Sequence, residues 1–385
     1  MVSGPSKGCS VWESAAMPQE IHDQISQLVG RSGRSAMMQA SSYFNHAFAG
    51  VHFEEMRFTH TQRGLSSLLR MFVFKCENSP STSGTDNVAF NKYIKAANIE
   101  CLEPPPEPMG VGRWEHAPDF PRVGWEPDDN LPGRIIKAVS LISKLRYLEL
   151  LLHHFTTDQH SSVNDLISIM ERWGSIRQLR VKSRFPGCVK GIIQQLVPNL
   201  NGLHLHVGTR SDLYVTAAAH HSGLERLHLT LTHQDFLTGE QAQGMPVNAT
   251  NRIRRDFKSL KWLTLEFDVE RVCWRDLTEF ENQRDNFVNA LKKLHCLDRL
   301  AFTIRRCHLQ INQVVSDEQS MSTFYHRLIQ FMSEQLPRIR SIAIRADYPK
   351  YYLGMKDEPG ITMTISDMDA SVLRRASWPS GVRDD

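Results

Sequence analysis

The sequence predicts an α/β protein in which short N-terminal helices precede an irregular solenoid of parallel strands with outer helices. Three observations predict this fold: apolar residues at helical spacing near the N-terminus, a six-residue apolar pattern that recurs along the chain, and helix-like segments between its copies. The chain has 385 residues, of which 41% are hydrophobic, so it can form a large core. Its net charge of +3 points neither to nucleic acid nor to a membrane surface as a partner.

The first helix is predicted within residues 17–30. Pro18 suits the first helical position, where its missing N–H costs nothing, and Gly30 suits the end. Apolar side chains of this segment repeat with helical spacing and form one face: Ile21, Ile25, Leu28 and Val29. After a polar turn at RSGRS, residues 35–49 are predicted to form a second helix, whose apolar face includes Met37, Ala40 and Phe44. This hairpin is too small to hold a core of its own.

A pattern of the form apolar-x-x-apolar-x-apolar predicts the strands of the solenoid. Its nine copies are residues 53–58, 94–99, 145–150, 176–181, 200–205, 224–229, 260–265, 297–302 and 339–344. Two successive copies begin 24 residues after the preceding one, which is within the period of leucine-rich repeats, and the other spacings require insertions. Helix-like segments follow several copies, as at 134–144 and 162–173. A short strand followed by a helix, repeated, gives parallel strands and a curved array.

These patterns divide the chain into four parts. Residues 1–16 are expected to be a flexible N-terminus, and residues 17–58 hold the helical hairpin and the first strand. The repeats extend over residues 59–346, interrupted by a proline-rich insertion at 103–133, and residues 347–385 form a C-terminal extension. The proline density of the insertion argues against regular structure, yet Trp114, Phe120 and Trp125 favour partial packing against the array.

The outward positions of three successive strands place basic side chains next to one another. Residues that alternate with the inward leucines of a strand point to its other face, which in a curved array is the concave one. The three strands contribute no acid at these positions and pool the following side chains: Arg180, Lys182, His204, His206, Arg226 and His228. We call this set the basic stripe. Trp262, on the next strand, is either an aromatic anchor for a partner or a covered surface tryptophan.

Three interpretations of the basic stripe are open at this point. It is a solvated sheet face, a site for an acidic or phosphorylated protein, or a metal site formed by its histidines. Arg180 and Lys182 beside the histidines disfavour a metal because they would repel it. If the histidines are exposed, the stripe gains charge when the pH falls towards 6.

The sequence contains no motif that predicts catalysis. It lacks a phosphate-binding loop, a nucleophile elbow and a zinc-protease helix, so we expect a non-catalytic protein without cofactor or metal. Its seven cysteines form no C-x-x-C pair and predict reduced thiols. The first residues show no apolar stretch of a signal peptide, and no run of 18 apolar residues occurs, so a cytoplasmic or nuclear location is expected.

The N-terminal P-x-E-I helix, the second short helix and the following repeats resemble the F-box/leucine-rich-repeat proteins, especially the type numerous in filamentous fungi. Pro18, Glu20, Ile21, Ile25 and Leu28 match the opening helix of that family. The positions of Met37, Ala40, Ser41 and Phe44 match its second helix more loosely. Two features differ: Met17 replaces the usual leucine, and GRSGRSAMM lacks the usual acidic residue followed by leucines.

The resemblance implies a substrate receptor of a cullin-based (SCF-type) ubiquitin ligase. In that family the helical hairpin docks on the Skp adaptor, which binds a cullin scaffold, and the repeats hold the protein substrate. It implies that the adaptor would contact the apolar residues of the hairpin, which are Met17, Pro18, Ile21, Ile25, Leu28, Met37, Ala40 and Phe44. The alternative is a leucine-rich-repeat interaction scaffold without a ubiquitin role, in which the hairpin only caps the array.

Overall fold

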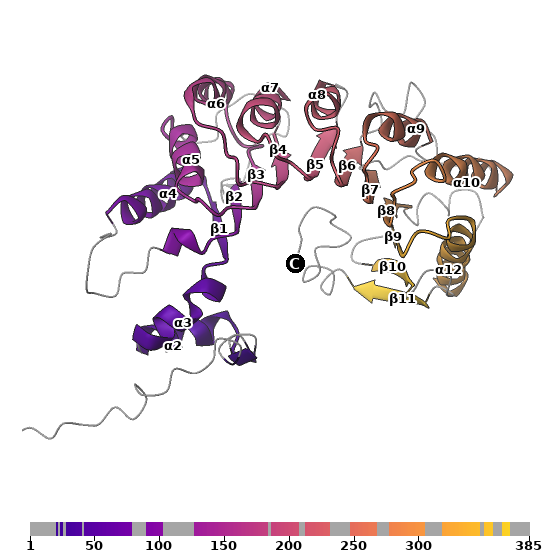
Figure 1. Ribbon diagram of the computed structural model, residues 1–385, viewed down its shortest axis with the longest axis horizontal. Helices are drawn as coiled ribbons and strands as arrows, with labels where there is room; N and C mark the ends of the chain where they lie inside the picture. The colour runs from indigo at the N-terminus through magenta and orange to yellow at the C-terminus, as the bar shows by residue number, and fades with distance from the viewer. Residues whose placement is uncertain are drawn as a thin grey trace, which may run out of the picture.

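The strands form one sheet along the inner side of an arch. A computed structural model describes residues 21, 24–25, 28–40, 42–78, 90–102, 127–183, 186–207, 212–231, 247–267, 277–304, 318–346, 350–356 and 364–369. Its sheet has eleven strands that lie side by side in chain order (Figure 1). The strands are β1 (Glu55–His60), β2 (Ala96–Cys101), β3 (Tyr147–Leu151), β4 (Gln178–Lys182), β5 (Gly202–Val207), β6 (Arg226–Leu231), β7 (Trp262–Phe267), β8 (Arg299–Thr303), β9 (Ser341–Arg345), β10 (Lys350–Met355) and β11 (Thr364–Asp369).

Each of the nine sequence patterns forms a strand, as predicted. Strands β1 to β9 pair in parallel, and each begins two residues after the first apolar residue of its pattern. That first residue lies directly before the strand. It is buried in every pattern, as Leu145, Leu224 and Leu260 illustrate, except in the first, whose Phe53 is half-buried. The pattern therefore fixes both the turn and the two inward side chains of the strand. The expectation of a mixed α/β array with parallel strands is confirmed.

The helices that connect the strands lie on the outer, convex side of the sheet. Parallel neighbours require a crossover, and a helix provides it between most strands (Figure 1). The helices are α2 (Arg31–Ala40), α3 (Ser42–His52), α4 (Gln62–Glu77), α5 (Leu131–Ser140), α6 (Thr157–Ile169), α7 (Pro186–Gly191), α8 (Asp212–His220), α9 (Val247–Asp256), α10 (Leu277–Leu291) and α12 (Glu318–Gln335), with a 3₁₀ turn η1 (Phe90–Lys92) and a π-helical turn η2 (Ile192–Leu196). Among the helices just named, none combines the length and apolar character that a membrane crossing needs.

The core is a continuous layer between sheet and helices. Inward side chains of successive strands, such as Leu203, Leu227 and Leu263, are fully buried and belong to one hydrophobic cluster that begins at Phe58 and reaches Tyr352. Each repeat therefore buries its leucines only by stacking on its neighbours, which is the physical basis of a solenoid.

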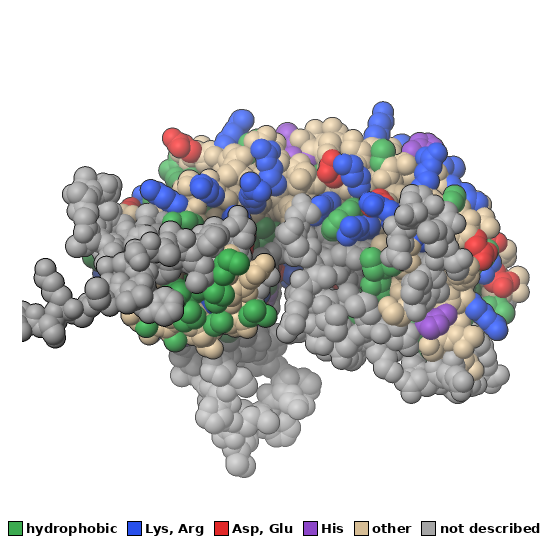
Figure 2. Space-filling view, turned by 60° about the horizontal axis from the view of Figure 1, so that its bottom comes forward, with side chains coloured by type: hydrophobic (Ala, Val, Ile, Leu, Met, Phe, Trp, Pro, Cys, Tyr) green, Lys and Arg blue, Asp and Glu red, His purple; other side chains and the backbone are tan. Residues whose placement is uncertain are grey.

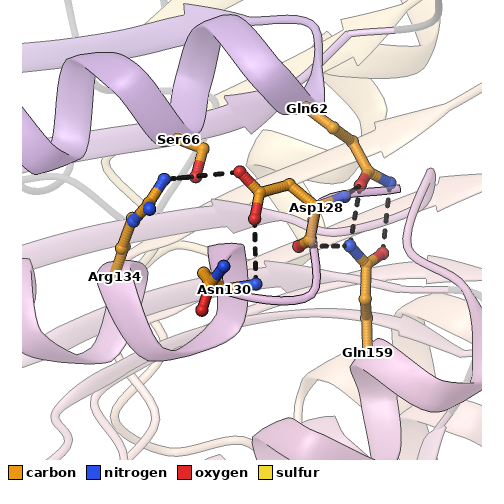
Figure 3. Close-up of polar contacts among 6 residues, drawn as sticks. All are labelled: Gln62, Ser66, Asp128, Asn130, Arg134 and Gln159. Atoms are coloured by element: carbon orange, nitrogen blue, oxygen red, sulfur yellow. Dashed lines mark hydrogen bonds and ion pairs between the residues drawn. The ribbon is translucent and has the colours of Figure 1, made fainter. Parts of the chain in front are cut away.

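A buried polar cluster ties the start of the array together (Figure 3). The side-chain amides of Gln62 in α4 and Gln159 in α6 donate to each other's oxygens at 3.1 and 2.7 Å, and both residues are buried. The backbone N–H of Asp128 donates to Gln62 Oε1 at 3.0 Å, and its carbonyl accepts from Gln159. Arg134 donates to the hydroxyl of Ser66. Burial alone would raise the pKa of Asp128, but Ser66, the N–H of Asn130 and Arg134 outweigh it and lower that pKa.

The boundaries of two predicted segments differ in the structure. The stretch 31–35, expected as a turn, is the first part of α2. Gly33 permits this helix because a Cβ there would come within 2.5 Å of the Val29 side chain. The predicted insertion 103–133 ends earlier than expected, since α5 starts at Leu131 with Pro132 in its first turn, where proline is tolerated. Residues 103–126, with Trp114, Phe120 and Trp125, lie outside the described residues.

The described residues of the predicted C-terminal extension, 347–385, continue the sheet. Strand β10 pairs antiparallel with β9, and β11 pairs antiparallel with β10. Lys356, directly after β10, is buried and donates to the carbonyls of Ser333 and Pro337 at 3.2 and 3.4 Å. A cation at this position interacts favourably with the C-terminal carbonyls of α12, so the extension is anchored to the array.

Candidate functional site: the concave stripe and the N-terminal helices

The strand register aligns the basic stripe as the sequence predicted. Arg180 lies opposite His204, which lies opposite His228, across strands β4, β5 and β6. One row away, Arg226 is opposite Trp262 on β7. The alignment follows from parallel strands in equal register, because residues at corresponding repeat positions then lie side by side.

The two central histidines form a buried stack. The rings of His204 and His228 lie 3.6 Å apart and almost parallel, and only 6% and 3% of these residues are exposed. His204 Nε2 is hydrogen-bonded to Thr230 Oγ1 at 3.1 Å. Because both rings are buried, these histidines shape the sheet face and form hydrogen bonds within it, and their ring nitrogens are little exposed to a ligand.

His204 does not respond to mild acid as expected from the sequence. Burial, and then the positive charges of His228 and Arg180, hold the pKa of His204 well below 6.5. A group in this position stays neutral at pH 6 because desolvation and like charges both disfavour its charged form. The expectation that His204 adds charge to the stripe near pH 6 is therefore wrong.

Acidic side chains bound the basic stripe on both sides. On β3, Glu149 Oε1 accepts from Arg180 Nη1 at 2.6 Å, and Glu149 Oε2 accepts from Asn98 Nδ2 at 2.7 Å. On β7, Glu266 lies 3.3 Å from His228 Nε2 and 3.1 Å from Arg345 Nη1. These residues occupy outward positions of the flanking strands: Glu149 lies in the row of Arg180 and His204, and Glu266 lies in the row of His206 and Thr230. An acid at an outward position beside the basic stripe was the signal that could have revealed the pairs.

Glu266 is held in its charged form. Burial alone would raise the pKa of Glu266, but His228 and Arg345 outweigh that effect and lower it to about 2. The carboxylate therefore remains ionised at every physiological pH and can hold the side chains of His228 and Arg345 in place.

Trp262 is covered on both ring faces by arginines. The guanidinium carbon of Arg226 lies 3.9 Å from the ring centroid, and that of Arg299 on β8 lies 4.2 Å away. Stacking of this kind is favourable and holds the guanidinium planes in place. Trp262 therefore has intramolecular partners on both neighbouring strands, and the residue is half-buried.

The accessible cations of the stripe lie in two neighbouring rows, Arg180 in one and Lys182 and His206 in the other. Lys182 is exposed, His206 is half-exposed, and the Arg180 side chain is 39% exposed despite its pairing with Glu149. These side chains can offer N–H donors to a carboxylate or another anion. Among the residues that the structure describes, no group of His, Cys, Asp and Glu side chains has the arrangement of a metal site.

The N-terminal helices expose apolar side chains. Leu28 is 87% and Ile21 is 40% exposed, whereas Ile25 is partly buried. In α2 and α3, Met37 is partly buried, Ala40 is exposed, and the Phe44 ring stacks on Phe48 at 5.4 Å. Met17 and Pro18 lie outside the described residues. Figure 2 shows hydrophobic side chains at the N-terminal end of the molecule, where these helices lie.

These helices are separate from the main core. Phe48 and Ala49 in α3 are fully buried, but the cluster that runs through the array starts only at Phe58. In Figure 1, α2 and α3 project from the end of the arch beneath β1. The segment is therefore attached to the array at one end and presents its remaining apolar surface to solvent.

A buried thiol–imidazole contact was not anticipated from the sequence. His160 Nδ1 lies 3.1 Å from Cys188 Sγ, and both residues are buried between α6 and α7. Burial lowers the pKa of His160 to about 4 and raises the pKa of Cys188. A neutral imidazole beside a protonated, inaccessible thiol is a packing contact without catalytic use.

No protein-family model matches the chain, and none of the curated proteins matches it significantly.

Proposed function

We propose that this protein is the non-catalytic substrate-recognition subunit of a cullin-based, SCF-type ubiquitin ligase. In this proposal the N-terminal helices act as an F-box that binds the Skp adaptor, and the α/β array, as a leucine-rich-repeat solenoid, binds the substrate. The observation that carries the proposal is the exposure of Leu28 and Ile21 on a helical segment outside the main core.

Exposed leucine on a small helical element favours a partner. Burying a leucine side chain contributes about 1.5–3 kcal/mol of free energy. Leu28 is exposed on the isolated chain, so a partner that covers it would gain this contribution to binding. An apolar helical face that lies against a partner's helices is a common recognition mode. The resemblance of this segment to an F-box identifies the adaptor as the partner that the proposal names.

The concave face supports the substrate-binding half of the proposal. Lys182 and Arg180 present N–H donors on a rigid sheet, where side chains hold their positions better than on loops. Their chemistry suits an acidic or phosphorylated substrate segment. Arg180 is a poor residue to replace because its loss would leave the buried Glu149 without its cation.

One pair of variants tests adaptor binding. Leu28→Asp should abolish co-purification of the Skp adaptor and the cullin with this protein. Ile169→Asp is the matched control, because Ile169 in α6 is also an exposed aliphatic side chain, at 77%. Equal adaptor recovery with both variants would refute the ligase proposal.

A second pair tests the substrate surface. Lys182→Glu should reduce the capture of ubiquitinated substrates while adaptor binding is retained. Lys190→Glu makes the same charge change at an exposed position in α7 on the outer side of the array. If both variants capture the same proteins as the wild type, the basic stripe does not bind substrate.

The second candidate function is an interaction scaffold without a ubiquitin role. It is favoured by the complete burial of Phe48 and Ala49, since a helix packed on the end of a solenoid can serve as its cap. In that case Leu28→Asp would leave every interaction unchanged.

A further inference from the structure

One edge of the sheet collects the turns that lead into the strands. Because the strands β1 to β9 are parallel, they all begin at the same edge, and the helices before them end there. We call this edge the entry edge and define it by the described turn residues before each strand from β2 to β9. It is distinct from the concave face that carries the basic stripe.

The entry edge is rich in exposed cations. Its basic residues, all exposed, are Lys92, Lys95, Lys144, Arg146, Arg172, Arg177, Lys258, Lys261, Lys292, Lys293, Arg338 and Arg340. Its acidic residues are Glu171, Glu225 and Asp298, and Glu54, directly before β1 at the same edge, pairs with Lys95 at 2.9 Å. The whole chain has a net charge of +3, so this edge concentrates positive charge that acids balance elsewhere. In Figure 2, Lys and Arg side chains recur along the arch on the face shown.

Internal pairing accounts for only some of these cations. Lys261 pairs with Glu225 at 2.7 Å, and Arg340 forms two contacts of 2.5 and 2.7 Å with Asp298. Within the described part of the chain, no ion pair joins Lys144, Arg146 or Lys293 to an acid. Cations at helix ends also offset the helix dipole, but that effect is confined to the last turn. Arg146 lies directly before β3, beyond that range from α5.

An apolar recess opens among these cations. It lies between the end of α10 and the end of α12, has a volume of about 300 Å³, and has Leu294 and Ile339 in its lining. Lys292, His295 and Arg338 also line it. Apolar lining within a basic rim suits an acidic segment that carries an apolar side chain, because one partner then satisfies both features.

We propose that the entry edge is a docking surface for an acidic protein segment, anchored by an apolar side chain in the recess between α10 and α12. Protein is favoured over nucleic acid for two reasons. The acids Glu225 and Asp298 interrupt the track that a phosphate backbone would follow. In the described turns of the edge no tryptophan or tyrosine is exposed as a stacking platform for bases. The proposal does not depend on a role in a ubiquitin ligase.

The test uses the full chain and three fluorescent probes: a glutamate-rich peptide with a leucine at every fourth position, the same peptide with serine in place of leucine, and a single-stranded oligonucleotide. The leucine peptide should bind most tightly by fluorescence anisotropy, and added salt should weaken its binding. Lys292→Glu/Lys293→Glu/Arg338→Glu should weaken it tenfold or more.

The matched control changes the same charge away from the edge. Arg70→Glu/Lys75→Glu/Arg327→Glu reverses three exposed cations on the outer faces of α4 and α12 and should leave peptide binding within about twofold. Unchanged melting by circular dichroism should accompany both triple variants. Equal losses in the two variants, equal binding of the leucine and serine peptides, or tighter binding of the oligonucleotide would each overturn the proposal.

Discussion

Replacing Glu266 by glutamine tests whether the contacts of this carboxylate with His228 and Arg345 stabilise the folded state. Glu266 lies within 3.3 Å of His228 and 3.1 Å of Arg345, and its side chain is 26% exposed. Its pKa falls from 4.5 to about 2. A shift of this size corresponds to about 3.4 kcal/mol, and screening of the partly exposed partners reduces the expected effect at pH 7 to about 2–3 kcal/mol.

The pH dependence of this effect has a definite sign. A carboxylate whose pKa is lowered in the folded state stabilises that state fully above the unfolded pKa of 4.5, and the contribution disappears as the pH falls through the folded value of about 2. The difference in unfolding free energy between wild type and Glu266→Gln should therefore stay nearly constant from pH 7 to 5. At pH 3 it should be less than half of its value at pH 7.

Urea unfolding followed by circular dichroism measures this difference at each pH. The control is Glu281→Gln, because Glu281 is an exposed residue of α10, and its replacement should change stability by less than about 0.5 kcal/mol. A difference below about 0.5 kcal/mol for Glu266→Gln at pH 7 would refute the proposed network. So would a difference that vanishes already between pH 6 and 5.

Two further predictions concern buried polar groups. Because burial lowers the pKa of His160 to about 4, the unfolded chain binds a proton below pH 6.5 that the folded chain does not. His160 should therefore lower the unfolding free energy by about 2 kcal/mol as the pH falls from 7 to 5. In His160→Gln the urea midpoint should depend less on pH over that range. The same pH dependence in wild type and variant would contradict the lowered pKa of His160. Gln159→Leu should destabilise by about 1–3 kcal/mol because it removes both hydrogen bonds between the buried amides of Gln62 and Gln159, and Gln62 then keeps only the His154 carbonyl and the Asp128 N–H. Gln62→Leu/Gln159→Leu should then lose less than the sum of the single variants, and strict additivity would show that the two amides are uncoupled.

The strands of this fold could be predicted because each repeat contains the same six-residue apolar pattern. Inward leucines recur at fixed offsets, so both the existence and the register of β1 to β9 follow from sequence. Several helices could not be predicted in the same way. Helix α8 has the sequence DLYVTAAAH, without a regular apolar stripe, and α9 buries only Ala249, Thr250 and Ile253 on an otherwise polar helix. Tertiary packing decides these helices, because the crossovers between parallel strands must be filled.

The composition of the candidate site was predictable, but its chemistry was not. The alignment of Arg180, His204 and His228 follows from register alone. The burial of the two histidines depends on the distance between the rings of His204 and His228, and the pairing of Arg345 with Glu266 crosses an intervening strand. Neither the ring distance nor the Arg345–Glu266 distance can be derived from the spacing of residues in the chain. The lowered pKa of His204 therefore could not be inferred from the sequence.

Titration calorimetry of the purified chain with the purified Skp adaptor measures the proposed interaction itself. We expect a one-to-one complex with a negative heat-capacity change, because the apolar side chains of the N-terminal helices, Leu28 foremost, leave water on binding. Leu28→Asp should remove the binding signal. If the wild-type chain forms no complex with the adaptor, the protein is not a receptor of an SCF-type ligase.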